Sequence, residues 1–324
     1  MKAILCEKLG DPSTLSLTEM PLRDPRPGEA KIAIKAAGIN FPDLLIVAGK
    51  YQYKPGLPFI PGFEVAGIIL ELGSANHQFH PGDHVMAHMR TGGYAEECVV
   101  PIEKIRTLPK NFDFSQGAGF QVAFSTAYVS LVPRGNLVEG ETLLVHGATG
   151  GVGLAAVQLG KALGAKVIAT VSNIKKIPAA KKSGADHVIV LETAKFRDEV
   201  KEITSGRGAD VIYDPVGGDV FDESLRCIAW GGRLLVVGFA DGRIPTAPAN
   251  LILIKGCSVV GVRAGEYGRQ DPEKGEKAYQ AILKLAEGGF LVPRIHAEFP
   301  LTEVAKAMAL ISRREVIGKV VLTP

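Results

Sequence analysis

The sequence predicts an α/β protein with a strand-rich half followed by a doubly wound parallel sheet. Its 324 residues exceed what one hydrophobic core usually supports, so two domains are expected. Before residue 120, Pro-Gly turns separate short segments in which apolar and polar residues alternate. From residue 141 onward, short apolar runs alternate with helical patterns. Such alternation with short loops is typical of a parallel sheet covered by helices on both faces.

The first half has the pattern of an antiparallel sheet. Its alternating segments have the period of two that half-buried strands show, and turn residues bound them. Apolar residues at mixed spacings of three and four follow over residues 114–131, which predicts helices that bridge to the second half. The predicted strands of the first half cover residues 30–37, 65–72, 84–88 and 95–99.

The second half predicts five strands and four helices in alternation, and a further strand at 257–262 is expected to close the sheet at its edge. Helices at 272–286 and 301–312 and a strand at 318–322 end the chain and are expected to return to the first domain. The five strands cover 142–146, 166–170, 187–190, 211–213 and 233–237, and the helices cover 152–163, 174–182, 194–204 and 220–229.

A glycine-rich turn follows the first strand of the second half. The apolar run at 143–145 breaks at once into small residues, with Ala148, Gly150 and Gly153 in the places of the G-x-G-x-x-G fingerprint. The turn opens a helix and a second strand follows, which is the context that the fingerprint requires. Glycines let a ligand approach the backbone, and the helix N-terminus attracts phosphate. A dinucleotide pyrophosphate site is therefore predicted at Ala148, Thr149, Gly150, Gly151, Val152 and Gly153.

The end of the next strand predicts which dinucleotide binds. An NAD site places Asp or Glu about 20 residues beyond the glycines, where it binds the ribose 2′-hydroxyl. This chain has Ser172 and Asn173 there, and then Lys175 and Lys176. Ammonium groups without a carboxylate suit the 2′-phosphate of NADPH. Ser172 and Lys176 are therefore predicted cofactor residues; the alternative is that the lysines form only a solvated helix face.

Two further glycine-containing turns follow predicted strands. Residues 214–218 read Asp-Pro-Val-Gly-Gly, and Gly238 and Phe239 follow the fifth strand. Both turns fall at the carboxyl ends of strands, where ligands bind in open α/β sheets. Gly217, Gly238 and Phe239 are therefore predicted to lie near the dinucleotide, although a tight turn before a helix would need the same glycines.

Composition narrows the class of protein. A formal net charge of +3 without a basic run argues against nucleic acid as the main partner, and no apolar run is long enough to span a bilayer. Glu7 and Lys8 interrupt the apolar start, unlike a signal peptide, so a cytoplasmic protein is expected. The four cysteines lie far apart and are expected to be reduced.

Several motifs together resemble the medium-chain dehydrogenase/reductase superfamily, and within it the zinc-free quinone oxidoreductases related to zeta-crystallin. The resemblance covers nearly the whole chain. It implies a GroES-like catalytic domain at 1–122 and 265–324 and a Rossmann NADP(H)-binding domain at 123–264. The motifs are Ala-Gly-Ile-Asn-Phe-Pro-Asp at 37–43, Pro-Gly-Phe-Glu-Val-Ala-Gly at 61–67, Pro-Gly-Asp-His-Val at 81–85, the 148–153 loop, 214–218, and Gly-Lys-Val-Val-Leu at 318–322.

The resemblance also implies site residues. Zinc alcohol dehydrogenases have cysteine, histidine and cysteine ligands where this chain has Asn40, Phe63 and a position close to Val122, so no catalytic metal is expected. A rival metal cluster of His77, His80, His84 and His88 is disfavoured because Pro81-Gly82 breaks any helix that would align them. The implied residues are Asn40, Asp43 and Tyr51 for catalysis, Phe41, Phe63 and Phe239 as pocket walls, and Lys319 for the cofactor.

Within that set, the roles stay open. Asn40 either donates a hydrogen bond to a carbonyl oxygen that gains charge or caps a turn. Tyr51 is a candidate proton donor, but Tyr53 is a near neighbour, and Asp43 is typical of a helix N-terminus. The expected activity is hydride transfer from NADPH to a small-molecule quinone. The alternatives are reduction of enones or enoyl thioesters, for which Lys255, Arg263 and Arg269 offer a basic patch, and a non-catalytic NADPH-binding structural or sensing protein.

Relatives of this kind pair their sheets through an edge strand. Here that strand is 258–262, so a homodimer through the edge near Ser258 is expected from the resemblance. Val259 and Val260 suit an interface, but they would suit a core equally well. The physiological acceptor does not follow from the sequence.

Overall fold

The computed structural model describes residues 1–74, 78–191 and 195–324. The chain packs as two compact units, residues 1–122 with 292–324, and residues 123–291. Helix α3 (Gln121–Val129) crosses the division and continues as a π-helical turn at Ser130–Arg134. Residues 265–291, which were predicted to belong to the first domain, pack within the second unit.

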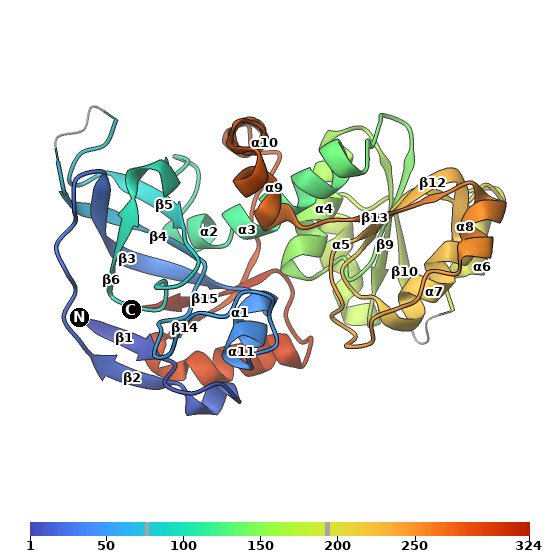
Figure 1. The fold of residues 1–324 in the computed structure, drawn as a ribbon. Coiled ribbons are helices and arrows are strands. Elements are labelled where there is room, and N and C mark those ends of the chain that lie inside the picture. Colours follow the sequence, from blue (N-terminus) through green and yellow to red (C-terminus); the bar gives the residue numbers. More distant parts are fainter. Residues whose placement is uncertain (75–77, 192–194) are drawn as a thin grey trace. The chain divides into compact units, whose positions relative to one another are not determined.

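The first unit is strand-rich, as predicted, and is built around the long strand β3 (Glu29–Ile39) (Figure 1). Its seven-stranded sheet has the order β14-β15-β3-β4-β5-β7, and β6 also pairs with β3. The pairs are antiparallel except β14 with β15. The other strands are β1 (Lys2–Leu5), β2 (Ser16–Glu19), β4 (Glu64–Leu72), β5 (His84–His88), β6 (Glu97–Pro101), β7 (Ile105–Thr107), β14 (Ile295–Pro300) and β15 (Lys319–Thr323).

Short helices cover this sheet, and β1 pairs with β2 in a separate ribbon. The expected return of the chain to the first domain is confirmed in part: the strand β15 pairs with β3, and the last helix belongs to the first unit. The helices are α1 (Phe41–Val47), α2 (Phe114–Ala118) and α11 (Val304–Ser312), with 3₁₀ turns at Pro12–Thr14, Ile102–Lys104 and Leu301–Glu303.

The predicted strand at 95–99 is displaced in the structure. Ile4 N donates to Tyr94 O, and Glu96 N donates to Lys2 O, so this stretch first bonds the backbone of β1. Only from Glu97 does it pair regularly with β3. The alternating pattern continued through both pairings, and so it could not show where one partner replaced the other.

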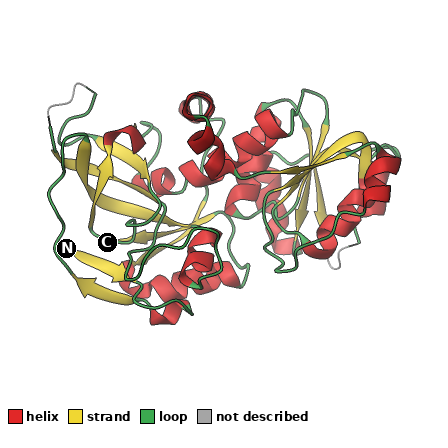
Figure 2. Cartoon of the chain, in the orientation of Figure 1, coloured by secondary structure: helices red, strands yellow, loops and turns green. Residues whose placement is uncertain are grey.

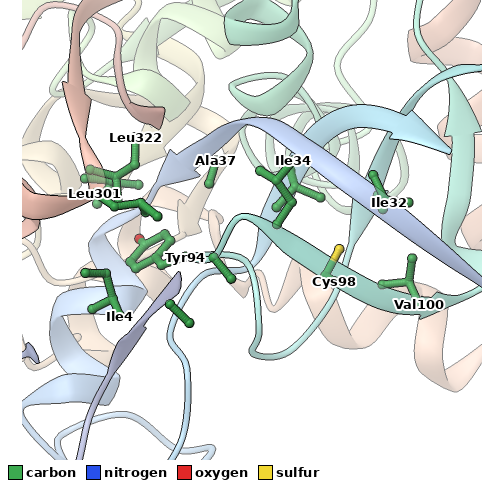
Figure 3. Packing of buried hydrophobic residues seen from close by; sticks show 14 of the residues in the cluster. Ile4, Ile32, Ile34, Ala37, Tyr94, Cys98, Val100, Leu301 and Leu322 are labelled. Atoms are coloured by element: carbon green, nitrogen blue, oxygen red, sulfur yellow. The ribbon is translucent and has the colours of Figure 1, made fainter. Parts of the chain in front are cut away.

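The core of the first unit is formed by residues of its strands together with residues of α1 and α11, and Figure 3 shows part of this cluster. Ile4, Ile34 and Leu322 come from three different strands and are almost completely buried. The ring of Tyr94 lies among them, and it is fully buried with its hydroxyl. Apolar residues at alternate positions of the strands therefore hold the unit together, with one polar group inside.

The second unit is the predicted doubly wound domain, with a six-stranded, wholly parallel sheet. Figure 2 shows helices on both faces of that sheet. The strand order β10-β9-β8-β11-β12-β13 is the order 3-2-1-4-5-6 of Rossmann domains. The strands are β8 (Thr142–Val145), β9 (Lys166–Val171), β10 (His187–Val190), β11 (Ala209–Asp214), β12 (Ile228–Val236) and β13 (Ser258–Gly261).

Helices of the second unit follow the predicted alternation. The helix predicted at 220–229 was too long: it ends at Cys227, and Ile228 and Ala229 begin β12. The helix predicted at 194–204 begins at Arg197, and residue 194 lies outside the described residues. The helices are α4 (Gly151–Ala162), α5 (Ile177–Lys182), α6 (Arg197–Ile203), α7 (Gly218–Cys227), α8 (Ala249–Lys255), α9 (Ala264–Gln270) and α10 (Pro272–Glu287), with a 3₁₀ turn at Ile174–Lys176.

Candidate functional site

The glycine-rich turn lies directly between β8 and α4. Ala148 N donates to Thr170 O at 3.1 Å, which anchors the turn to β9. Helix α4 has Gly150 as its N-cap, and its first hydrogen bond runs from Leu154 N to Gly150 O. By helix geometry, the N–H groups of residues 151–153 therefore point out of the helix end. This arrangement suits an anionic ligand such as a pyrophosphate.

The glycines of this turn serve different purposes. Gly147 has φ +56°, a conformation that favours glycine. A Cβ on Gly153 would lie 2.1 Å from Gly147 O, so this glycine is needed for packing inside the turn. A Cβ on Gly150 would meet nothing closer than Gly147 O at 3.5 Å. Internal packing therefore does not explain Gly150, whereas close approach of a ligand would.

The turn lies at the switch point of the sheet. β8 has β9 on one side and β11 on the other, and the strand order reverses between β8 and β11. Ligands bind outside the carboxyl ends of strands at such a point. The loops after β8 and β11 contain the glycine-rich turn and residues 214–218, so the two predicted ligand loops flank one position.

The loop after β11 is held by Asp214. Its Oδ1 accepts hydrogen bonds from Val216 N at 2.8 Å and Gly217 N at 2.9 Å. Burial raises the pKa of Asp214 to about 6, although these two bonds act in the opposite direction. A Cβ on Gly217 would lie 3.1 Å from the ring of Phe239, and one on Gly238 would lie 3.2 Å from Pro215 O. The predicted residues Gly217, Gly238 and Phe239 therefore lie together.

The predicted phosphate residues follow β9. Ser172 is exposed immediately after the strand, and Lys176 is buried in the 3₁₀ turn. Lys175 is exposed. Because β9 neighbours β8 in a parallel sheet, the end of β9 and the glycine-rich turn lie on the same edge.

A buried histidine immediately precedes the glycine-rich turn. His146 is completely buried, and its ring atoms Nδ1 and Nε2 lie 3.0 Å from Thr170 Oγ1 and 2.8 Å from Ser224 Oγ, respectively. Ser224 Oγ donates to Val220 O, so it accepts from Nε2–H, and Nδ1 accepts from Thr170. The imidazole is thus held neutral, and burial lowers its pKa to about 3.

Because its pKa is lowered by burial, His146 is expected to make the folded protein less stable in acid. The unfolded chain binds a proton at His146 below an ordinary pKa of about 6.5, whereas the folded chain does so only near 3. The contribution of the neutral, buried imidazole to the free energy of unfolding is fully present above pH 6.5 and is lost as the pH falls. Between pH 7.5 and 5, His146 should therefore lower the free energy of unfolding by about 2 kcal/mol, and we expect this loss to be absent in His146→Gln.

Urea unfolding of the wild type and the variant at pH 7.5 and pH 5 measures this loss. Subtracting the change in the variant from the change in the wild type removes the contribution of the other titrating groups, which both proteins share. Equal pH dependence in the wild type and the variant would contradict the assignment.

In the first unit, Asn40 and Asp43 form the start of α1. Asn40 is the N-cap, and its backbone N–H donates to Asp43 Oδ2 at 2.8 Å. Both residues are buried. Burial raises the pKa of Asp43 to about 7, against the hydrogen bond from Asn40 and the nearby Tyr94. The helix-terminal position expected of Asp43 is thus what the structure has.

Glu64 is a further partner of these residues, which the sequence did not indicate. Glu64 Oε1 accepts from Lys319 Nζ at 2.9 Å and from Asn40 Nδ2 at 3.0 Å, and Oε2 accepts from Val122 N at 2.9 Å. Lys319 Nζ also donates to Asn40 Oδ1 at 2.5 Å. The Glu64 and Lys319 side chains are only 1% and 6% exposed. Lys319, predicted to bind the cofactor, thus forms a buried ion pair.

An aromatic group lies next to this cluster in the sequence. The centroid of the Phe63 ring lies 6.3 Å from that of the Tyr51 ring, with the rings edge to face. It lies 6.4 Å from the centroid of the His88 ring, which is nearly parallel to Phe63. Tyr53 instead lies under the guanidinium of Arg90, at 4.8 Å. The structure therefore brings Tyr51 together with the predicted wall Phe63. Phe41, at the start of α1, is 38% exposed.

The four histidines that lie close together in the sequence were considered as a metal site and disfavoured. His77 lies outside the described residues, and His80 is exposed beside Asp83. His84 is exposed against the Phe114 ring at 4.9 Å, whereas His88 contacts Phe63. In the part of the chain that the structure describes, no three His, Cys, Asp or Glu side chains lie together in a way that could hold a metal ion.

A hollow of about 440 Å³ in the first unit is lined by residues 83–84, 107–110 and Phe112, and it contains none of the predicted site residues. Over the described ranges, no helix is both long and apolar enough to cross a membrane.

Comparisons with known proteins give one consistent result. Residues 26–133 match the alcohol dehydrogenase GroES-like domain, and residues 151–284 match the zinc-binding dehydrogenase family. A quinone oxidoreductase-like protein 2 homolog of Nematostella vectensis is 39% identical over 99% of this chain and 88% of its own length.

Solved structures agree with these matches. The Escherichia coli quinone oxidoreductase complexed with NADPH is 31% identical, with a TM-score of 0.92 over 100% of both chains. The CurK enoyl reductase is 26% identical, with a TM-score of 0.90 over 99% of this chain and 98% of its own.

Proposed function

Because the chain belongs to the quinone oxidoreductase family of the medium-chain dehydrogenase/reductase superfamily, we propose that it is an NADPH-dependent reductase of quinones. The observation that carries this proposal is the glycine-rich turn at the switch point of the second unit, where α4 presents its N-terminus. NADPH, when bound, supplies the hydride, and the protein supplies binding, orientation and exclusion of water.

The proposed cofactor residues come from four loops of the second unit. The turn from Ala148 to Gly153 binds the pyrophosphate through backbone N–H groups, and the loops after β11 and β12 bind the remainder of the dinucleotide. Lys319 has its ammonium group engaged by Glu64 and Asn40, and we keep it as a residue that orients these two groups. The residues are Ala148, Thr149, Gly150, Gly151, Val152, Gly153, Ser172, Lys176, Gly217, Gly238 and Phe239.

The choice of NADPH over NADH depends on Lys176. We expect Lys176→Ala to raise the Michaelis constant for NADPH about ten- to a hundredfold, because a charge-assisted contact to the 2′-phosphate is worth about 1.5–3 kcal/mol. The constant for NADH, which lacks that phosphate, should change little. Steady-state kinetics with both cofactors measure this.

Lys182→Ala, an exposed lysine of α5, is the matched control and should leave both constants unchanged. If Lys176→Ala affects both cofactors equally, Lys176 does not bind the 2′-phosphate.

We further propose that the reaction is independent of zinc. The residues that stand where zinc alcohol dehydrogenases have ligands do not fit the metal. The Asn40 oxygen accepts from the Lys319 ammonium, Phe63 offers only a ring, and Val122 offers its backbone N–H to Glu64. A buried ammonium beside the oxygen donors opposes a divalent cation, and zinc needs three N, S or O ligands.

For the acceptor side, we propose Tyr51, Phe41 and Phe63 of the first unit. Flat aromatic rings suit a planar quinone, which is electrophilic without a Lewis acid. The amide nitrogen of Asn40 already donates to Glu64 Oε1 at 3.0 Å and to Gly38 O at 3.4 Å. We therefore assign Asn40 to positioning Glu64 and Lys319, and not to binding the substrate carbonyl.

Reduction of an enone or enoyl thioester is the second candidate, because an enoyl reductase has the same fold over nearly the whole chain. The basic patch that would favour an acyl carrier is weakened, since Arg263 and Arg269 both pair with Glu266, at 3.5 and 2.9 Å. The test is NADPH oxidation with an ortho-quinone and with an α,β-unsaturated ketone, with NADH as control and with a metal chelator.

Faster turnover of the quinone, unaffected by the chelator, is the expected result. Preference for the enone would move the function to double-bond reduction. Tight NADPH binding without turnover would favour a structural or sensing role, and activity lost to the chelator and restored by zinc would contradict zinc independence.

We also propose a homodimer through β13, the edge strand that begins at Ser258. Three exposed apolar side chains lie on neighbouring elements: Trp230 is 78% exposed, Leu253 is 79% and Ile254 is 63%. A Cβ on Gly256, just before β13, would lie 3.1 Å from the Trp230 ring, so this ring borders the edge. An edge strand beside exposed apolar groups favours pairing with another chain.

Light scattering after gel filtration should therefore give the mass of a dimer. Leu253→Glu should weaken dimerisation at least about tenfold, a cost of about 1.4 kcal/mol. The control Val138→Glu changes a residue that is also exposed but lies before β8. A wild type that is monomeric at high concentration would refute the proposal.

A further inference from the structure

The aromatic group of the first unit contains an ionisable ring that no role above explains. His88 ends β5 and is paired across the strands with Glu64, which starts β4. Its imidazole lies nearly parallel to Phe63, with an angle of 17° between the rings, and Tyr51 lies edge to face against the same Phe63. His88 thus packs against Phe63, one of the residues proposed to bind the acceptor.

The burial of His88 distinguishes it from the other described histidines. His80, His84, His187 and His296 are exposed, and His146 is completely buried with both ring nitrogens engaged. His88 is partly buried, so it combines a fixed position with access to solvent protons. That combination is what a proton donor needs, because it must be aligned in the reaction and recharged afterwards.

Ionisable groups lie on the strands that pair with β5 and on the chain segments next to it. Glu64 lies opposite on β4, and its carboxylate is neutralised by Lys319. Tyr51 contacts the same Phe63 ring as His88. Arg90, two residues after His88, lies over the ring of Tyr53. From β7, Arg106 pairs with Met86 and donates to backbone carbonyls.

We propose that His88 is the proton donor for the reduced acceptor, an inference that rests on the proposed quinone reduction. Hydride from NADPH brings two electrons and one hydrogen to the quinone and leaves a hydroquinone monoanion and NADP⁺. The imidazolium of His88 then gives its proton to the anionic oxygen, which yields the neutral hydroquinone and a neutral imidazole. Solvent returns a proton to the imidazole.

Other nearby groups suit this step less well. A phenol such as that of Tyr51 has an ordinary pKa of about 10, whereas an imidazole titrates near 6.5, which matches proton transfer at neutral pH. The Asp43 carboxyl is 1% exposed and accepts a hydrogen bond from Asn40 N, so it is turned into the unit. His88 is the group whose chemistry and position agree.

The test compares His88→Gln with the matched control His84→Gln, which changes an exposed histidine on the same strand. NADPH oxidation with an ortho-quinone is measured between pH 5.5 and 8.5. His88→Gln should lower kcat about 100-fold, leave the Michaelis constant for NADPH unchanged, and remove the fall in kcat as the imidazole deprotonates. His84→Gln should retain the wild-type profile.

A second readout needs neither cofactor nor turnover. The imidazole C–H signals of His88 and His84 are assigned in the wild-type protein by triple-resonance NMR. Adding the quinone alone to the wild-type protein should shift the His88 signal and leave the His84 signal in place. Because it uses the wild type, this readout holds even if a variant folds poorly.

The outcomes separate the two proposals. If the wild type reduces neither acceptor, the proposed function fails. If the wild type reduces the quinone but His88→Gln keeps its rate and pH profile, or if the quinone leaves the His88 signal unmoved, the function stands and the role of His88 is overturned.

Discussion

Gly150→Ala will weaken NADPH binding at least about tenfold without destabilising the protein. Gly150 has φ −75° and ψ 170°, a conformation open to any residue, and a Cβ there would lie 3.5 Å from the nearest atom, Gly147 O. The fold therefore tolerates the methyl group. If the pyrophosphate lies against this backbone, the methyl group occupies space that the ligand needs. Fluorescence titration with NADPH and urea unfolding measure the two effects.

Gly153→Ala is the informative comparison. Its Cβ would lie 2.1 Å from Gly147 O and 2.8 Å from Gly147 C, and backbone atoms cannot move aside cheaply. This variant should lose about 1–3 kcal/mol of stability as well as NADPH affinity. If Gly150→Ala binds NADPH as tightly as the wild type, the glycine-rich turn does not hold the dinucleotide as proposed.

The second unit could be predicted from sequence because its signals are local. The run at 143–145 is completely buried in β8, and a break into small residues follows at once. Predicted boundaries failed where two elements meet without a turn residue. Ile228 and Ala229 extend the apolar face of α7 as well as they begin β12, and only pairing with β11 decides between the two.

The first unit was harder because its site consists of long-range contacts. Asn40 and Asp43 lie three residues apart, and their helix-capping relation follows from that spacing. Glu64 and Lys319 are separated by 255 positions, and no pattern along the chain links them. The contact between His88 and Phe63 depends likewise on the pairing of β4 with β5. The residue types were visible in the sequence, but their partners were not.

Removing one member of the Glu64–Lys319 pair will destabilise the first unit strongly. Both side chains are almost completely buried, and Glu64 Oε1 lies 2.9 Å from Lys319 Nζ. Lys319→Met leaves a buried carboxylate whose remaining partners are the Asn40 amide and Val122 N. Breaking a buried pair in this way typically costs about 3–5 kcal/mol, because the uncompensated charge stays out of water. Urea unfolding measures the loss.

The double variant Glu64→Gln/Lys319→Met distinguishes charge from packing. With both charges removed, no buried ion lacks a partner, so much of the lost stability should return, and the coupling between the two sites should be about 1–3 kcal/mol. Glu64→Gln keeps an oxygen for Val122 N, so the start of α3 remains bonded. If the two single losses simply add, the ion pair does not stabilise the unit as a pair, and the buried cluster acts through shape alone.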